Sequence, residues 1–158
     1  MIRVGIGYDS HRFVSGRPLI LAGQHIPHSH GLGGHSDADA VAHALIDAVL
    51  GATARGDIGT LFPDTDPTWK DADSMELLAQ VARRLAEEGA RVRQVDVTVV
   101  LEAPKLGPHK AAMAAALASK LGIEEGAVGV KAKTNEGMGF IGRGEGIAVM
   151  AVATVETP

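Results

Sequence analysis

Short apolar runs bounded by Gly, Pro or Asp recur along the chain and predict six strands. The predicted strands span residues 2–8, 18–22, 24–27, 95–101, 128–134 and 146–155. Apolar residues at helical spacing predict three helices, which begin near Ser36, Asp73 and Pro108 and end at Gly51, Gly89 and Gly122. This order predicts an α+β fold with helices packed on one side of a mixed β-sheet. The length predicts a single domain, residues 1–158.

Two stretches stand out from this regular pattern. The last strand, Ile147–Val155, is nearly all apolar, which is typical of burial on both faces and leaves one face for another subunit to cover. Residues 55–72 are dense in Gly, Pro and Asp. Long irregular segments are uncommon in compact domains and tend to be functional, so we expect this segment to contribute to a binding site.

Composition excludes several classes of function. The net charge is −4 and aromatic residues make up 3%, so we expect no nucleic-acid partner, because such proteins present basic or aromatic surfaces. The chain has no Cys, which rules out disulfides and thiolate metal sites. The N-terminus lacks the pattern of a secretory signal, and no apolar run reaches membrane-spanning length. We therefore expect a soluble, cytoplasmic protein without a membrane partner.

A candidate metal site involves Asp9, His11 and His43. Asp9 and His11 are two residues apart in a strand, so their side chains point to one face, and His43 lies in the middle of the first helix. Two His and one carboxylate leave a tetrahedral ion one open position, as in catalytic zinc sites. Asp39 and Asp47 share a helix ridge with His43 and are predicted to orient its imidazole. A D-x-H triplet also arises by chance, so these residues alone leave a coincidental grouping open.

Two further stretches are candidates for phosphate binding. His35 and Ser36 open the first helix, where free amides favour an anion, although an ordinary helix cap explains the same residues. Thr134 and Glu136 share one face of a strand end and could hold a diphosphate with its Mg²⁺, with a polar strand end as the alternative. Gly137–Gly142 fits G-x-G-x-x-G, but a strand follows instead of the helix that a dinucleotide site requires.

Taken together, five segments closely resemble the 2-C-methyl-D-erythritol 2,4-cyclodiphosphate synthase family of the non-mevalonate isoprenoid pathway. The segments are Gly7–His11, His35–Asp39, Gly56–Asp66, Ala103–Lys105 and Gly139–Gly146. The string G-D-I-G-T-L-F-P-D-T-D at residues 56–66 is highly specific, and the resemblance extends over essentially the whole chain.

The resemblance implies a lyase that cyclises 4-diphosphocytidyl-2-C-methyl-D-erythritol 2-phosphate and releases CMP. It also implies a homotrimer around a three-fold axis, with sites between adjacent subunits. Two other functions remain open for these residues. One is a zinc-dependent phosphohydrolase, and the other is a non-catalytic trimer that binds isoprenoid diphosphates.

The resemblance also implies roles for individual residues. Asp9, His11 and His43 bind Zn²⁺, or alternatively Mn²⁺ or Co²⁺, and Glu136 helps to hold Mg²⁺ or Mn²⁺ between two phosphates. His35 and Thr134 match positions that stabilise the transition state. The implied substrate contacts are Ser36, Asp57, Ile58, Gly59, Phe62, Pro63, Asp64, Thr65, Asp66, Leu101, Ala103, Pro104, Lys105, Leu106, Gly107, Lys133 and Asn135.

Two features of the resemblance concern phosphate binding away from the metal. Phe140 and Arg143 match residues that line a cavity on the three-fold axis, which can hold an isoprenoid diphosphate. Lys133 and Asn135 replace the more usual threonines beside Thr134, so the detailed phosphate contacts at this strand end stay open.

Overall fold

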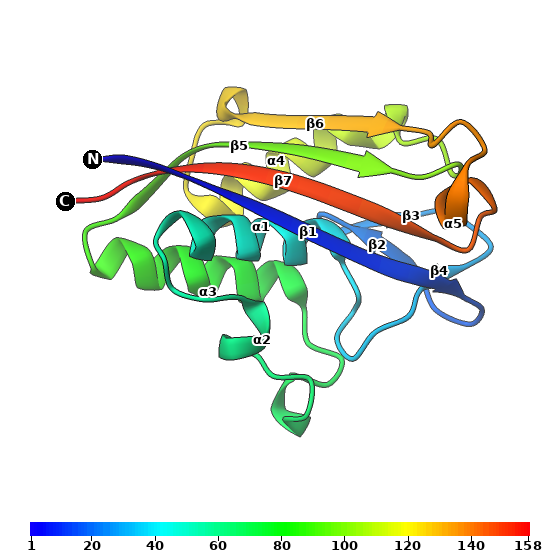
Figure 1. The fold of residues 1–158 in the computed structure, drawn as a ribbon, viewed down its shortest axis with the longest axis horizontal. Helices are drawn as coiled ribbons and strands as arrows, with labels where there is room; N and C mark the ends of the chain where they lie inside the picture. The colour runs from blue at the N-terminus through cyan, green and yellow to red at the C-terminus, as the bar shows by residue number, and fades with distance from the viewer.

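The computed structural model describes residues 1–158, which form a mixed five-stranded sheet with helices on one face (Figure 1). The sheet has the order β4-β1-β7-β5-β6, in which only β5 and β6 are parallel neighbours. Its strands are β1 (Ile2–Val14), β4 (Gly31–Leu32), β5 (Arg91–Val100), β6 (Val128–Lys133) and β7 (Gly146–Glu156). A separate hairpin consists of β2 (Leu19–Leu21) and β3 (Gln24–Ile26).

Three helices of regular length cover the sheet, and shorter turns connect the other elements. The three are α1 (Ala40–Ala52), α3 (Ser74–Glu87) and α4 (Lys110–Leu121). The short elements are α2 (Ile58–Leu61), α5 (Gly139–Gly142), η1 (Pro67–Trp69), η2 (Gly107–His109) and η3 (Glu125–Ala127). None of the helices is both long enough and apolar enough to cross a membrane. The predicted α+β class, with helices on one side of a mixed sheet, is confirmed.

The structure differs from the sequence prediction mainly at element boundaries. β1 continues to Val14 because it pairs with β7 as far as the Arg12–Gly146 register, so Asp9 and His11 lie inside a strand. The short strand β4 lies between residues 27 and 36, where the sequence analysis predicted no strand or helix. The first helix begins at Ala40, because Asp39 rather than Ser36 is its N-cap. The 55–72 segment is broken only by single turns of helix.

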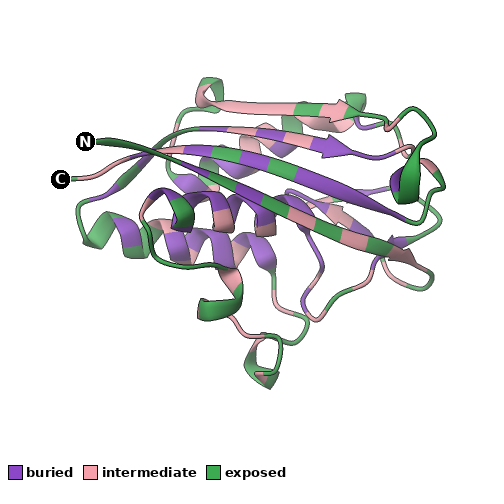
Figure 2. Ribbon diagram, viewed as in Figure 1, coloured by how far each residue is buried: buried purple, intermediate pink, exposed green.

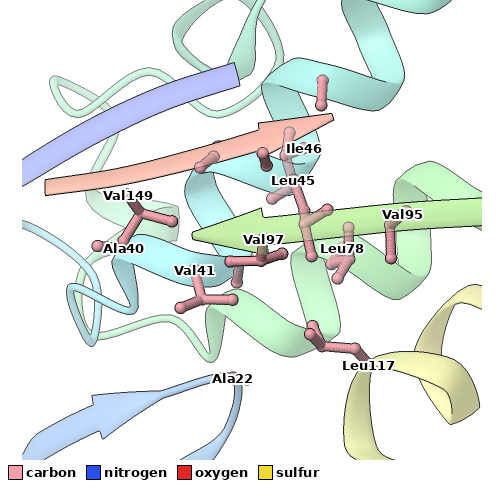
Figure 3. Packing of buried hydrophobic residues seen from close by; sticks show 14 of the residues in the cluster. Ala22, Ala40, Val41, Leu45, Ile46, Leu78, Val95, Val97, Leu117 and Val149 are labelled. Atoms are coloured by element: carbon pink, nitrogen blue, oxygen red, sulfur yellow. The ribbon is translucent and has the colours of Figure 1, made fainter. Parts of the chain in front are cut away.

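The core lies between the sheet and the helices, where α1 makes the closest approach. Val41 and Leu45 of α1 pack against Val97 and Val149 of the sheet, and Figure 3 shows this cluster with Leu78 beneath it. All of these side chains are fully buried. α1 is thus held by apolar contacts on several sides, which fixes the position of every polar group it carries.

Two glycines of β1 set the distance between that strand and α1. A Cβ atom at Gly7 would lie 1.8 Å from the carbonyl oxygen of Ala44, and one at Gly5 would lie 2.0 Å from that of Ala48. The strand and the helix therefore touch through their main chains. Because side chains alternate along a strand, Asp9 and His11 continue the helix-facing row that Gly5 and Gly7 begin.

The opposite face of the sheet is exposed and apolar. Along β1, Ile2, Val4, Ile6 and Tyr8 are between 56% and 71% exposed, and Met150 and Val152 of β7 lie beside them. Figure 2 shows this face as alternating buried and exposed positions on the two strands. The helices cover one face of β7, and the cover of its other face by another subunit stays a prediction.

Candidate metal centre

The side chains of Asp9, His11 and His43 converge on one point between β1 and α1. The Asp9 Oδ2 atom lies 2.8 Å from His11 Nε2 and 3.3 Å from His43 Nδ1. The two imidazole nitrogens are 3.3 Å apart. All three side chains are partly buried, at 14–24% exposure. The sequence prediction that these residues meet is therefore borne out in the geometry.

The hydrogen bonds around this cluster turn lone pairs toward its centre. His11 Nδ1 donates to the carbonyl oxygen of Gly33 at 2.7 Å, which leaves Nε2 without a proton in the neutral imidazole. Asp9 Oδ2 is buried and has no hydrogen-bond partner of good geometry. Facing lone pairs at such short separations repel one another unless a cation or a proton lies between them.

The spacing of the three atoms fits a divalent cation. Zinc bonds of about 2.0–2.2 Å to His and carboxylate place the ligand atoms of a tetrahedral site ~3.3 Å apart. The two separations to His43 Nδ1 match this value, and the third is slightly shorter. Three protein ligands leave one position free for a substrate oxygen or water. The residues present therefore fit a catalytic metal, whose identity the geometry leaves among Zn²⁺ and related ions.

The electrostatics of the cluster also favour positive charge. Burial opposes ionisation of Asp9, but the close approach of the His11 and His43 rings outweighs it and lowers the pKa of Asp9. Burial likewise disfavours a protonated His11, yet the neighbouring Asp9 carboxylate raises the pKa of His11. The lowered pKa of Asp9 and the raised pKa of His11 both indicate that this site favours positive charge.

The far side of the His43 ring is held by a serine that the sequence analysis did not single out. His43 Nε2 lies 2.8 Å from Ser74 Oγ and 3.1 Å from Ser36 Oγ. Ser74 Oγ in turn donates to Asp37 Oδ1 at 2.5 Å. Asp37 also accepts the backbone N–H of Ser74, which ties the start of α3 to the turn before α1.

The predicted orienting role of Asp39 and Asp47 is wrong. Asp39 accepts hydrogen bonds from the backbone of Ala22 and Gly23, and it also caps α1. Asp47 Oδ1 accepts the backbone N–H of Ile58 at 2.7 Å, so it anchors the irregular segment instead. Both carboxylates therefore accept backbone N–H groups and form no hydrogen bond with the His43 ring.

The predicted anion site at the start of the first helix is also corrected. The free amides that would bind an anion, those of Val41 and Ala42, are already bonded to the Asp39 carboxylate. Burial raises the pKa of Asp39 to about 6, although hydrogen bonds from Gly23, Ala22 and Ala42 act in the opposite direction. An anion near His35 would therefore not be bound by the N-terminal amides of α1.

A cavity of about 420 Å³ opens directly beside the metal cluster. It is lined by His11, Gly34, His35, Ser36, His43, Ile58, Gly59, Phe62, Pro63, Asp64, Trp69 and Leu77. His35 Nε2 donates to the carbonyl oxygen of Asp66 at 3.2 Å, and Asp57 caps the α2 turn through Thr60. Much of the predicted substrate segment 57–66 thus surrounds the same opening as the metal cluster, while Asp64 and Thr65 are exposed.

The second group of predicted substrate residues lies at the other edge of the sheet. Thr134 and Glu136 follow β6 and form a hydrogen bond of 3.2 Å with each other, while Lys133 is exposed on the opposite side of the strand end. β6 is three strands away from β1, which corresponds to ~14 Å at the usual strand spacing. A single chain therefore does not bring Thr134 and Glu136 to the metal cluster.

Residues 101–107 adjoin this second group. Glu102 Oε1 accepts the backbone N–H groups of Asn135 and Gly137, which joins the two segments. Leu101 and Leu106 are buried in the core, so their side chains are not available to a ligand in this chain. The solvent-facing members of the segment are Ala103, Lys105 and Gly107, with Pro104 partly exposed.

Phe140 and Arg143 occupy the surface near α5. Phe140 is 40% exposed and lines a cavity of about 790 Å³ together with His11 and Ala103. Arg143 forms an ion pair of 2.9 Å with Glu145. His11 lines both this larger cavity and the cavity beside the metal cluster.

Sequence reasoning missed Asp37, Ser74 and Glu102. Ser74 follows Asp73, near which a helix was correctly predicted to begin, and that helix start gave no reason to single out Ser74. Asp37 lies inside a recognised motif, but its partner is 37 residues away. No spacing along the chain signals such contacts, because they depend on how α3 packs beside α1.

Comparison with known proteins is consistent with this geometry. The model of the YgbB family matches residues 2–156. The 2-C-methyl-D-erythritol 2,4-cyclodiphosphate synthase of Salinibacter ruber is 53% identical, with 99% of each chain covered. The bifunctional enzyme IspD/IspF of Novosphingobium aromaticivorans is 57% identical over 97% of this chain, which spans 40% of that longer protein.

Solved structures give the same result. A 2C-methyl-D-erythritol-2,4-cyclodiphosphate synthase in its CDP-bound form has a TM-score of 0.89 and 40% identity, with 98% of this chain and 100% of that chain covered. The bifunctional IspDF of Campylobacter jejuni has a TM-score of 0.96 and 45% identity, with coverage of 100% of this chain and 43% of that one. Because the family model and a relative at 53% identity each cover nearly its whole length, the chain belongs to the YgbB family.

Proposed function

We propose that the protein is a phosphorus–oxygen lyase that converts 4-diphosphocytidyl-2-C-methyl-D-erythritol 2-phosphate into 2-C-methyl-D-erythritol 2,4-cyclodiphosphate and CMP. The observation that carries this proposal is the Asp9–His11–His43 cluster, which borders the cavity lined by His35, Ile58, Gly59 and Phe62–Asp64. Relatives that match almost the full length of the chain carry this activity in their names. A metal-dependent phosphohydrolase and a non-catalytic isoprenoid-binding trimer have no such support.

Asp9, His11 and His43 hold Zn²⁺, or Mn²⁺ or Co²⁺ in its place, and Glu136 helps to hold Mg²⁺ or Mn²⁺ at the diphosphate. When bound, these ions offset the negative charge of the phosphates and of the departing CMP oxygen. His35 and Thr134 contact the reacting phosphates and stabilise the charge that develops on them. Ser36 borders the same cavity, and Asp57–Gly59 with Phe62–Asp66 enclose the methylerythritol part.

The attacking group is the substrate's own 2-phosphate, so the protein needs no nucleophile or strong general base. A phosphate monoester has a second pKa near 6 and is already largely ionised at pH 7. Its oxygen forms a bond to the β-phosphorus while the bond from that phosphorus to the CMP oxygen breaks, and CMP leaves with the electron pair. The protein therefore needs no activated serine, and the hydroxyl groups of Ser36 and Ser74 lie instead against the ring of the metal ligand His43.

The physical difficulty is the approach of two anions. At an effective dielectric constant of about 20, two unit charges about 4 Å apart repel each other by roughly 4 kcal/mol. Holding both ends of one substrate makes the reaction intramolecular, and good alignment lowers the barrier by about 7–11 kcal/mol. We assign this alignment to the segment 56–66, which the Asp47–Ile58 hydrogen bond anchors beside the metal cluster.

We further propose a homotrimer in which each site combines the metal cluster of one chain with residues 101–107 and 133–136 of its neighbour. Two observations support this arrangement. The metal cluster and Glu136 lie at different edges of one sheet, and the uncovered sheet face exposes a row of large apolar side chains. Burying such a row is the usual basis of a stable oligomer. In this trimer, Phe140 and Arg143 line a cavity on the three-fold axis that binds an isoprenoid diphosphate. We also propose that the protein is located in the cytoplasm.

Phosphorus NMR of the products tests the reaction. We expect the cytidyl substrate to give a cyclic diphosphate and one equivalent of CMP, and we expect chelation of divalent metals to stop both. A linear monophosphate product would instead identify a phosphohydrolase. The absence of CMP release under all metal conditions would leave only a binding function.

Complementation between two inactive variants tests the shared site. His43→Ala removes one half of the site, and a Thr134→Ala/Glu136→Ala double variant removes the other. If each site uses two chains, random co-assembly restores both halves at about a quarter of the sites. Activity of the mixture near a quarter of wild type is expected, whereas a mixture as inactive as its components would show that each site belongs to one chain.

A further inference from the structure

We infer that Ser74 is a positioning residue for the metal centre, because it fixes which nitrogen of His43 is free to bind the metal. Ser74 is completely buried, and its hydroxyl lies between the imidazole and the Asp37 carboxylate. Three groups from separate elements thus form one chain of hydrogen bonds, Asp37–Ser74–His43. The inference rests on the metal assignment in the proposed function and adds to it a residue that does not touch the metal.

The direction of the hydrogen bonds follows from the chemistry of the groups. An ionised carboxylate only accepts, so the single hydroxyl proton of Ser74 points to Asp37 Oδ1. The hydroxyl oxygen then has only lone pairs to offer His43 Nε2, which must carry the proton. The neutral ring has one N–H, so Nδ1 keeps its lone pair. Nδ1 is the atom that faces Asp9 and His11.

His11 is held in the complementary way. Its Nδ1 donates to the carbonyl oxygen of Gly33, so its Nε2 is the free nitrogen. The two imidazoles therefore use different ring nitrogens for the same purpose, and each has its own partner behind it. Metal-bound histidines are commonly oriented by such outer partners, whose loss weakens metal binding by about 10–100-fold.

The position of Ser74 is itself secured by the backbone. Ser74 is the first residue of α3, and its own N–H donates to Asp37 Oδ2 at 3.1 Å. Asp37 therefore accepts two hydrogen bonds from Ser74, one from its backbone N–H and one from its hydroxyl, which restricts rotation of the hydroxyl group. Ser36 Oγ, 3.1 Å from His43 Nε2, is the only other side-chain acceptor near that nitrogen. Ser36 can partly replace Ser74 as the acceptor, so we expect loss of the Ser74 hydroxyl to weaken metal binding by an amount near the lower end of the ~10–100-fold range.

A zinc competition assay on metal-free protein tests the inference without using activity. Wild type, Ser74→Ala, Ser74→Thr and Thr53→Ala are each titrated with Zn²⁺ against a chromophoric chelator. We expect Ser74→Ala to bind zinc about 10-fold more weakly, and Ser74→Thr, which keeps the hydroxyl, to bind as wild type does. Thr53 provides the matched control, because its hydroxyl bonds only to Val49 and Leu50 near the end of α1.

Nitrogen-detected NMR of zinc-loaded wild type supplies a readout that a merely structural role would not change. We expect the Nε2–H proton of His43 to be present and protected from exchange, and to exchange faster in Ser74→Ala. A zinc-bound Nε2 with the proton on Nδ1 would overturn the inference without any variant.

The possible outcomes separate the inference from the function on which it rests. If wild type binds no zinc, the metal assignment itself fails. If wild type binds zinc and Ser74→Ala binds it equally well with unchanged Nε2–H exchange, the metal assignment stands and the role of Ser74 is refuted.

Discussion

The two halves of the proposed site differ in how completely one chain builds them. Around the metal cluster, His11 and His43 each have a hydrogen-bond partner behind the ring, and every side chain involved is at least partly buried. Thr134 and Glu136, in contrast, are exposed and contact mainly each other. The metal cluster is therefore ordered within one chain before substrate binds. Thr134 and Glu136 instead lie on an open surface, as expected for a site that another molecule completes.

This difference has a physical reason. Ligands with facing lone pairs must be held apart from competing partners and aligned to within tenths of an ångström, which requires a packed environment. A contact to a flexible diphosphate tolerates more freedom, because the substrate brings its own charge. We therefore expect substitutions in the metal half to act through metal binding and those in the other half to act through substrate alone.

The largest effect is expected from His43→Ala. Loss of a ligand releases the metal, and with it several kcal/mol of charge stabilisation, so activity should fall by about 10³-fold or more. Metal analysis should show an empty site while the oligomer persists. His25→Ala, which removes an exposed histidine outside the cluster, serves as the control. Full zinc occupancy in a folded His43→Ala protein would contradict the assignment.

Gly7→Ala should disturb the metal half through the main chain. The added Cβ would meet the Ala44 carbonyl, which cannot move without displacing α1. We expect unfolding to become easier by at least about 3 kcal/mol, with weaker zinc binding because His43 moves with the helix. Gly126→Ala has open space around the new Cβ and should be nearly neutral in chemical denaturation. Equal stability of the two variants would disprove the close contact.

The buried cap of α1 predicts an unusual pH dependence. The pKa of Asp39 is about 6 in the folded protein against an ordinary 3.8, so between these values the folded state holds more protons than the unfolded state. Stability from this group is therefore lost as pH rises through that window and is constant above it.

Metal-free wild type and Asp39→Asn provide the test. A tenfold change in proton affinity corresponds to about 1.4 kcal/mol, so wild type should lose ~2–3 kcal/mol relative to the variant between pH 4 and 7. Urea unfolding at several pH values measures the difference. A difference independent of pH would mean that the backbone hydrogen bonds to Asp39 cancel the effect of burial.

The smallest effect is expected from Glu136→Gln, in the exposed half. Removing one charge while keeping the shape should raise the Mg²⁺ concentration needed for activity by about 10-fold, in line with one charge-assisted contact of roughly 1.4 kcal/mol. Zinc content should not change. A magnesium titration identical to that of wild type would remove Glu136 from this role, and a loss of zinc would show that the two halves are not independent.

Local periodicity predicted the layers of the fold, whereas the meeting of His43 with Asp9 and His11 was implied by the family resemblance, because the spacing alone left a coincidental grouping open. Alternation in β1 placed Asp9 and His11 on one face, and the helix pattern around Val41 placed α1 correctly in the fold. The same reasoning failed for Asp39 and Asp47. A shared helix ridge shows only the direction in which the side chains point. Tertiary packing decides which group each side chain contacts.

The contacts that the sequence analysis missed have the same origin. Ser74 and Asp37 are brought together by the packing of α3 beside the turn before α1, at a separation of 37 residues along the chain. Contacts of this kind become visible only when the fold is known.

The bare crossing of β1 and α1 at Gly5 and Gly7 has one more consequence. No side chain lies between the two backbones there, so direct main-chain contact sets the distance between Asp9 and His43. Substitutions in the apolar core elsewhere should leave this distance unchanged. The core side chains could therefore be varied widely in protein design, and β1 and α1 could be transferred to another protein together as one metal-binding unit.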